Sequence, residues 1–122
     1  SLVSIELTFA MRGTYVGTGM LKIYDSPNRS VLIGTATNTI NDTSTGEFSS
    51  VTGTFNFSGV TLTAETSYYF EMTNSANSNV FYLWETSGNP YSGGCAYSAY
   101  NDTPPPTQYS TYDIKFVITY YY

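Results

Sequence analysis

The feature that most constrains this chain is a two-residue alternation of apolar and other side chains. It is plainest near the start, where the apolar positions are Val3, Ile5, Leu7, Phe9 and Met11. A period of two is typical of a β-strand with one buried face, whereas an amphipathic helix repeats its apolar residues every three to four positions. No helical period persists over three turns anywhere in the sequence. The alternation therefore predicts an all-β protein.

Strand-like segments recur along the chain and are separated by turn residues. Asp25 to Asn28 has the composition of a tight turn, with left-handed backbone expected at Asn28. Residues 38–50 are polar and predict a surface loop, and the prolines at 104–106 cannot pair inside a sheet. Together these signals predict one antiparallel β-sandwich of about eight strands, formed by residues 1–122 as a single domain. The strand segments are expected at 3–11, 20–24, 31–37, 51–57, 62–72, 80–85, 94–100 and 112–121.

Charge and composition exclude several classes of partner. The net charge is −5, and only 11% of the residues are charged. So few cations cannot form a patch that follows a phosphate backbone, which argues against nucleic acid. No apolar run approaches the roughly 18 residues of a membrane span, so membrane insertion is not expected. The four basic residues are Arg12, Lys22, Arg29 and Lys115.

Cys95 is the single cysteine, so no disulfide can form within the chain. We expect it to be a small half-buried residue rather than a reactive thiol. A chain rich in Ser, Thr, Asn and Tyr that does not rely on disulfides fits an extracellular, cell-surface or virion-surface protein. The chain opens without Met and directly in a strand pattern, which suggests a piece of a longer product.

Four stretches form an ordered set of motifs: LKIYDSPNRSVLIGTA, VTLTAETSYYFEM, YLWETSGNPYSGGCAYS and DIKFVITYYY. In order and spacing they resemble a jelly-roll-like module of secreted bacterial proteins and phage structural proteins, over about half of the chain. The resemblance implies a jelly-roll type of sandwich, often described as carbohydrate-binding-like. Two departures are the missing strand that usually precedes the position of Val3, and Cys95 where a small residue such as Ser is usual.

A second motif is the spacing Leu62-x-x-x-Thr66-x-Tyr68. It resembles the tyrosine corner of fibronectin type III domains and related sandwiches. In that corner a Tyr hydroxyl ties a loop between the sheets back to the backbone.

Catalytic groups are scarce. The chain has no His and one Cys, which excludes triads and zinc sites built on those residues. A glycosidase needs only two facing carboxylates, but no pairing is evident among the available acids. We therefore predict a protein that is not an enzyme and has no catalytic residues. The acids considered are Glu6, Glu47, Glu71, Glu85 and Asp113.

Aromatic side chains supply the candidate binding site. If Phe81 and Leu83 are core residues, alternation places Tyr82 and Trp84 outward. Aromatic rings stack on the apolar face of a sugar while nearby amides and carboxylates bind its hydroxyls. The same rings could instead pack in the core or against loops, or form a protein–protein surface. The candidate ligand-binding residues are Tyr69, Tyr82, Trp84, Glu85, Asn89, Tyr91 and Tyr97.

Two functions follow from this reading. The first is a non-catalytic carbohydrate-binding or adhesion module of an extracellular or phage surface protein. The second is a structural subunit of a virion, fibre or extracellular filament, which assembles through β-strand and Tyr-rich contacts. Its partners would be neighbouring subunits, including copies of itself, and its motivation includes the closing Tyr120 to Tyr122. No cofactor is expected. A structural calcium ion is the alternative, at the loop acids Asp25, Asp42, Glu47 and Asp102.

Overall fold

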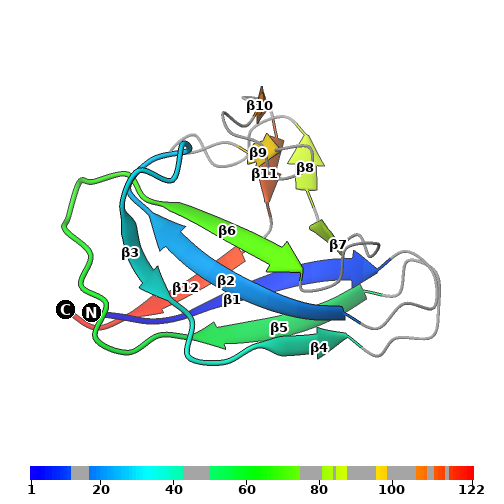
Figure 1. Ribbon diagram of the computed structural model, residues 1–122, viewed down its shortest axis with the longest axis horizontal. Coiled ribbons are helices and arrows are strands. Elements are labelled where there is room, and N and C mark those ends of the chain that lie inside the picture. Colours follow the sequence, from blue (N-terminus) through cyan, green and yellow to red (C-terminus); the bar gives the residue numbers. More distant parts are fainter. Residues whose placement is uncertain are drawn as a thin grey trace.

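The computed structural model is an all-β sandwich of two antiparallel sheets, and its described part contains no helix (Figure 1). This confirms the predicted fold class. The described backbone comprises residues 1–11, 17–42, 50–74, 81–83, 85–87, 96–98, 107–109, 112–114 and 116–122. Side chains are described for residues 1–8, 18–41, 52–73 and 116–122.

The first sheet is built around the long strand β1 (Leu2–Met11). On one side β1 pairs with β5 (Ser50–Asn56), and on the other with β12 (Phe116–Tyr120). The end of β1 also pairs with β7 (Phe81–Leu83). All of these pairings are antiparallel. The alternating segment expected at 3–11 is therefore the centre of this sheet, and the segment expected at 51–57 forms one of its edges.

The second sheet is built around β2 (Gly17–Tyr24). β6 (Tyr69–Asn74) pairs with β2 from Gly19 to Tyr24. β3 (Leu32–Thr35) and β4 (Ile40–Asp42) each pair with a different end of β2. Figure 1 shows β2 and β6 lying across β1 and β5, as the two layers of a sandwich.

Two short ladders lie beyond the main sheets. β8 (Glu85–Ser87) pairs with β11 (Tyr112–Ile114), and β9 (Ala96–Ser98) pairs with β10 (Thr107–Tyr109). These four strands gather on one side of the sandwich (Figure 1). With them the described part of the chain has twelve strands rather than about eight, because β4 and β7 to β11 are only three residues each.

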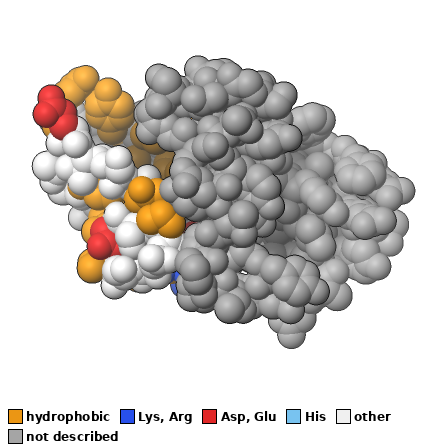
Figure 2. Space-filling model, turned by 90° about the horizontal axis from the view of Figure 1, so that it is seen from above, with side chains coloured by type: hydrophobic (Ala, Val, Ile, Leu, Met, Phe, Trp, Pro, Cys, Tyr) orange, Lys and Arg blue, Asp and Glu red, His pale blue; other side chains and the backbone are white. Residues whose placement is uncertain are grey.

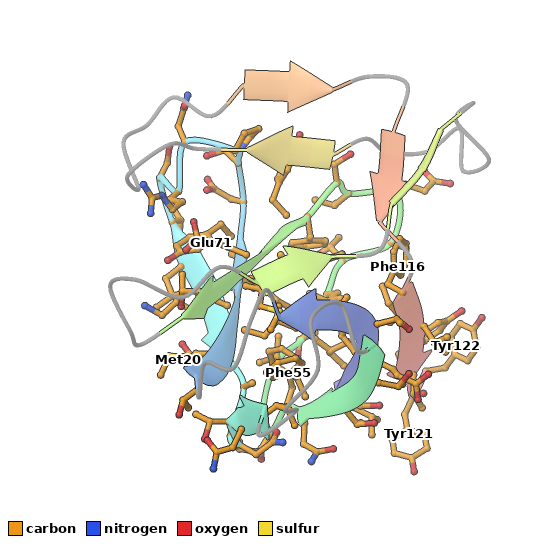
Figure 3. The ribbon with its side chains drawn as sticks, turned by 90° about the vertical axis from the view of Figure 1, so that its right-hand side faces the viewer. Met20, Phe55, Glu71, Phe116, Tyr121 and Tyr122 are labelled. Carbon is orange, nitrogen blue, oxygen red and sulfur yellow. The ribbon has the colours of Figure 1, made fainter. Side chains whose placement is uncertain are left out.

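The core contains the residues that the alternation selected. Ile5, Leu7, Leu21, Ile23 and Phe55 are all buried. Figure 3 shows Phe55 between the two sheets. Each such side chain contributes about 1.5–3 kcal/mol by leaving water, so the inward faces of β1, β2 and β5 account for most of what holds the layers together.

One residue near the start of β1 departs from the alternation. The register runs from Leu2 opposite Tyr120 directly to Ser4 opposite Thr119, which leaves Val3 as an extra residue, a β-bulge. The bulge reverses the faces, so Leu2 is buried (3% exposed) while Val3 is only half-buried. The expectation that Val3 shares one buried face with Ile5 and Leu7 was therefore wrong. Sequence periodicity cannot show a bulge, because Leu2 and Val3 are both apolar.

The segment predicted as a loop at residues 38–50 contains a strand. Ile40 pairs with Gly19 as part of β4 and packs against the core. The preceding Asn38 lies along β5: its Nδ2 donates to the carbonyl of Thr54 at 2.9 Å, and its Oδ1 accepts from the N–H of Asn56 at 2.7 Å. The polar composition of this segment concealed β4 from sequence analysis. The side-chain amide of Asn38 makes two bonds to β5 that the backbone of a neighbouring strand would otherwise make.

The turn after β2 is confirmed, with its left-handed residue one position later than predicted. Arg29, not Asn28, has a positive φ of 59°. The N–H of Arg29 donates to the carbonyl of Ser26 at 3.0 Å, and the N–H of Val31 donates to Oδ1 of Asp25 at 2.8 Å. These two bonds close the turn around Arg29 and hold it in a conformation that costs about 1–2 kcal/mol for a residue with a Cβ.

The last predicted strand, at residues 112–121, is divided between two ladders. Ile114 belongs to β11 and pairs with Glu85, whereas Phe116 begins β12 and pairs with Leu7. Phe116 packs against the core and meets Phe70 of β6 edge to face at 5.5 Å. This contact ties β12 to the second sheet.

Candidate ligand-binding surface

Tyr69 is the only predicted site residue whose side chain is described, and it stands beside a second tyrosine. The register of β6 and β2 pairs Tyr69 directly with Tyr24, and Tyr24 is in turn opposite Leu32 of β3. Residues directly opposite on adjacent strands have Cβ atoms about 4.5–5.5 Å apart. The two tyrosines and Leu32 therefore form a row across three strands.

This row lies on the outer face of the second sheet. The residues that flank it in sequence, Ile23 and Phe70, pair with each other and face the core. Alternation then turns Tyr24 and Tyr69 away from the core, where both are half-buried, and Leu32 is exposed. We call this row, together with the charged groups beside it, the Tyr24–Tyr69 face.

Charged side chains adjoin the two tyrosines. Glu71 follows Tyr69 on the same face of β6 and is opposite Lys22 of β2. Nη1 of Arg29 lies 3.3 Å from a carboxylate oxygen of Glu71, and both side chains are partly exposed. Figure 3 shows Glu71 and Met20 on the outer side of the second sheet. Hydrogen-bonding groups of both signs thus stand next to aromatic rings, although the net charge of the protein is negative.

Tyr68 holds the start of β6 in place. Its hydroxyl accepts a hydrogen bond from the backbone N–H of Thr63 at 2.8 Å. This bond lowers the pKa of Tyr68 below its ordinary value, because the donated hydrogen stabilises the phenolate. A bond between the Tyr hydroxyl and the backbone is what the resemblance of the Leu62 to Tyr68 spacing to a tyrosine corner implied. By closing the loop, it fixes the strand position from which Tyr69 projects.

The other predicted residues do not share this face. Tyr82 lies in β7 of the first sheet, at the register position opposite Ala10, so Tyr69 and Tyr82 belong to different layers of the sandwich. Glu85 lies in β8 opposite Ile114, and Tyr97 lies in β9 opposite Gln108, in the two neighbouring short ladders (Figure 1). Three more predicted residues, Trp84, Asn89 and Tyr91, lie outside the described residues.

The register of β7 places its three residues along the end of β1. Phe81 is opposite Met11 and Leu83 is opposite Phe9, which are positions of β1 that alternate with Ala10. The prediction grouped Tyr69 and Tyr82 only because neither strand pairing nor layer can be read from one sequence.

Tyr24 and Arg29 were missed as members of a candidate site. Tyr24 could have been found, because it continues the outward positions of the strand at 20–24 by two residues from Lys22. The contribution of Arg29 could not have been found from the sequence, because it depends on the left-handed turn that brings its guanidinium to Glu71.

A second exposed surface lies at β12. Val117 is 55% exposed, Ile118 is 38% exposed and Tyr120 is 52% exposed, which is unusual for large apolar residues within a strand. Tyr121 and Tyr122 project away from the sandwich beyond β12 (Figure 3). Figure 2 shows another part of the described surface, where exposed hydrophobic side chains lie among uncharged polar and acidic ones.

The terminal tyrosines contact each other. The rings of Tyr120 and Tyr122 meet edge to face at 5.3 Å, and their hydroxyls lie 3.2 Å apart. The hydrogen bond to Tyr122 raises the pKa of Tyr120, and repulsion between the two phenolates adds to the effect. The pair therefore extends the exposed apolar surface of β12.

The acids considered for calcium do not assemble within the described residues, where no group of three His, Cys, Asp or Glu side chains is placed to hold a metal ion. Oδ1 of Asp25 accepts the N–H of Val31 and thus closes the turn. Glu47 and Asp102 lie outside the described residues, as does the side chain of Asp42. The described part of the chain also contains no helix of the length and apolar character needed to span a membrane.

Comparison with known proteins returned no relatives: no family model, curated protein or solved structure matches this chain.

Proposed function

We propose that this protein is a non-catalytic carbohydrate-binding or adhesion module that binds sugars at the Tyr24–Tyr69 face. The observation that carries the proposal is the direct pairing of two half-buried tyrosines on the outer face of a sheet. Neighbouring rings on a rigid sheet offer a flat apolar surface for the C–H face of a pyranose. The backbone pairing fixes the spacing of the rings, so little conformational entropy is lost on binding.

Polar groups beside the rings supply orientation. The carboxylate of Glu71 accepts hydrogen bonds from sugar hydroxyls, and Arg29 and Lys22 donate to sugar oxygens. Because Arg29 and Glu71 are already paired, the carboxylate is held in position before a ligand arrives. Neutral saccharides, and not strongly anionic ones, fit a face on which charges of both signs are interspersed.

The proposal also includes a place for the protein. An extracellular, cell-surface or virion-surface location agrees with the hydroxyl-rich composition and the absence of any disulfide requirement. The hydrogen bond from Thr63 to Tyr68 supports the likeness to Greek-key sandwiches that carry a tyrosine corner. Assignment to a jelly-roll module of secreted or phage proteins is part of the same proposal.

A glycan array of neutral mono- and oligosaccharides tests the function, followed by calorimetric titration of the best saccharide. Tyr24→Ala and Tyr69→Ala should each weaken binding about tenfold, equivalent to about 1.4 kcal/mol. Tyr121→Ala, which removes an exposed tyrosine far from this face, is the matched control and should bind like the parent. No binding at millimolar saccharide, or unchanged binding by the Tyr24→Ala/Tyr69→Ala double variant, would contradict the proposal.

One further arm separates this face from the aromatic loop predicted by sequence. If Trp84→Ala abolishes binding while the Tyr24 and Tyr69 variants bind normally, the carbohydrate site lies around Tyr82, Trp84 and Tyr91 instead. That result would keep the proposed function and move its site.

A structural subunit of a virion, fibre or filament is the second candidate. The exposed apolar edge at β12 favours it, because Val117, Ile118 and Tyr120 are large apolar side chains that are all exposed on this one strand. Large exposed apolar side chains along one strand are typical of contacts between subunits. Electron microscopy of the purified chain tests this role. Filaments or closed particles would support it, and dispersed small particles at every concentration would not.

A further inference from the structure

The two edge strands of the first sheet, β5 and β12, differ in the hydrogen bonds made along their outer sides. Along β5, the N–H of Thr37 donates to the carbonyl of Asn56 at 2.7 Å, and Asn38 makes two more bonds to the same edge. These contacts occupy the groups with which another strand would pair. At the opposite edge, β12 pairs with β1, and no strand in the described ranges lies on its other side.

Nothing in the sequence of β12 protects this edge. Natural edge strands are usually guarded by charged side chains, proline or a bulge. Residues 116–122 read FVITYYY, with no charge and no proline, and β12 pairs with β1 without interruption from Phe116 to Tyr120 except where β1 itself bulges. Its side chains are exposed on both faces, as Val117 and Ile118 show. The edge is therefore suited to accept another strand.

The hydrogen-bonding phase of β12 shows which groups point outward. Ser1 and Tyr121 exchange both of their backbone bonds, so the N–H and C=O of Tyr121 face β1. In an antiparallel ladder this direction alternates from residue to residue. Val117 and Thr119 therefore direct their backbone groups toward β1, while Ile118 and Tyr120 direct theirs away from it.

We propose that two copies of this chain pair through β12 as antiparallel neighbours, with Ile118 on the two-fold axis. In this register the outward N–H and C=O of Ile118 meet those of Ile118 in the second copy. The outward groups of Tyr120 then face the strand of the second copy. The first sheet then continues from one copy into the other as one antiparallel sheet.

The side-chain rows favour a second copy of this chain as the occupant. Ile5 is already opposite Ile118, so the paired copies align four isoleucines in one row across the axis. In the next row Leu2 and Tyr120 align with Phe116 and Leu7 of the second copy. Cross-strand pairs of β-branched and aromatic residues stabilise a sheet, and these rows continue the buried face of β1.

Charge is also compatible with pairing. The charged residue of β1 nearest to the axis is Glu6, opposite Val117. Two copies of Glu6 would be separated by three strand spacings, or about 14 Å, which exceeds the Debye length of about 8 Å at physiological salt. The remaining obstacle is the net charge of −5 on each copy, and this repulsion is weakened by salt. Association should therefore strengthen as ionic strength rises.

This pairing deepens the second proposed function and also limits it. A contact in which the same strand meets itself across a two-fold axis closes after two copies and cannot by itself form a filament. The inferred unit is therefore a dimer, and any fibre would need a different surface. The dimer is independent of the Tyr24–Tyr69 face, which lies on the other sheet.

Sedimentation velocity of the chain over a wide concentration range, at low and high salt, is the first test. A reversible monomer–dimer equilibrium that strengthens with salt is the expected result. Amide hydrogen exchange followed by NMR gives the register without any mutation. Protection of Ile118 and Tyr120 should rise with protein concentration, whereas Val117 and Thr119 should be protected at every concentration. A monomer at millimolar concentration, or concentration-dependent protection elsewhere only, would overturn the proposal.

Complementary charges at one position provide the second test. Because Ile118 pairs with itself, Ile118→Lys and Ile118→Glu should each be monomeric, and an equal mixture of the two should form a mixed dimer. Ile118→Thr, a β-branched control, should retain more self-association than either. Circular dichroism establishes that each variant is folded. If a variant does not fold, the hydrogen-exchange result on the parent chain decides. Dimers that persist in both charged variants would refute this interface, and filaments that persist would support the fibre role through another surface.

Discussion

The hydroxyl of Tyr68 accepts the backbone N–H of Thr63 at 2.8 Å, and this bond fixes the loop that leads into β6. Thr66 reinforces the same loop by donating its hydroxyl to the carbonyl of Ala64 at 3.3 Å. Glu65 between them has a positive φ of 56°, a conformation that needs such support. The loop is therefore held by hydrogen bonds and not by buried apolar residues alone.

Tyr68→Phe should lower the midpoint of thermal unfolding, because it removes the acceptor for the Thr63 N–H and leaves the ring in place. Calorimetry measures the midpoint. Tyr24→Phe is the matched control, since it deletes a hydroxyl from an outward ring of the neighbouring strand. Equal midpoints for the two variants would show that the Tyr68 bond contributes nothing specific.

The tyrosines should ionise in a defined order. The bond from Thr63 lowers the pKa of Tyr68 and the contact with Tyr122 raises the pKa of Tyr120, so in alkali Tyr68 should ionise before Tyr120. The folded pKa of Tyr68 lies below the unfolded value near 10, so this group stabilises the fold above that value and loses the contribution as pH falls. Tyr120 has a raised pKa, so its contribution is present below pH 10 and is lost as pH rises further. Ultraviolet difference titration of Tyr68→Phe and Tyr120→Phe should remove an early and a late component, respectively. The same component missing from both variants would contradict this order.

Gly34→Ala should destabilise the protein by about 1–3 kcal/mol, the usual cost of overpacking a core. A Cβ on Gly34 would lie 2.5 Å from Cγ2 and 3.3 Å from Cγ1 of the buried Val60, a stiff β-branched side chain. At Gly19 the closest atom would be the flexible end of Met72, so Gly19→Ala should cost less than about 1 kcal/mol. Urea denaturation measures both. In a Val60→Ala background, Gly34→Ala should lose less stability than in the parent. An equal loss in both backgrounds would show that the contact with Val60 does not cause the destabilisation.

Leu2→Ala should cost about 2–5 kcal/mol, whereas Val3→Ala should cost only about 1 kcal/mol. The reason is the β-bulge, which buries Leu2 and leaves Val3 half-buried. Chemical denaturation of the two variants tests the bulge directly. The reverse order of costs would mean that uninterrupted alternation continues to the start of β1.

Asn38→Ala should destabilise the protein by about 1–3 kcal/mol, because two hydrogen bonds to the edge of β5 are lost. Asn41→Ala is the control: its side chain accepts a single exposed bond from Thr18, so its cost should stay below about 1 kcal/mol. Equal unfolding midpoints in urea would show that the Asn38 bonds are replaced by water at no cost.

Most of the sandwich could be predicted because burial and alternation are local properties. Ile5, Leu7, Leu21, Ile23 and Phe55 occupy positions that a period of two selects without knowledge of any partner strand. The bond between Thr63 and Tyr68 was also local, since six residues contain both of its ends.

The candidate site was harder to predict because it depends on which strands are neighbours. Tyr24 and Tyr69 are 45 positions apart, and only the pairing of β2 with β6 brings them together. Tyr69 and Tyr82 are close in sequence, yet they lie in different sheets. The bulge at Val3 and the strand at Ile40 were missed for the same reason. Each is defined by its pairing with another strand and not by its own residues.

The mutual hydrogen bonds of Ser1 and Tyr121 bring the first and last residues of the described chain to one corner of the sandwich (Figure 1). A linker of a few residues could join them, so a circularly permuted chain with new ends in a surface turn should keep the fold. Any sequence fused to either end would leave from this same corner. In a fusion the domain would be attached at this one corner, and the outer face of its second sheet would stay exposed to solvent.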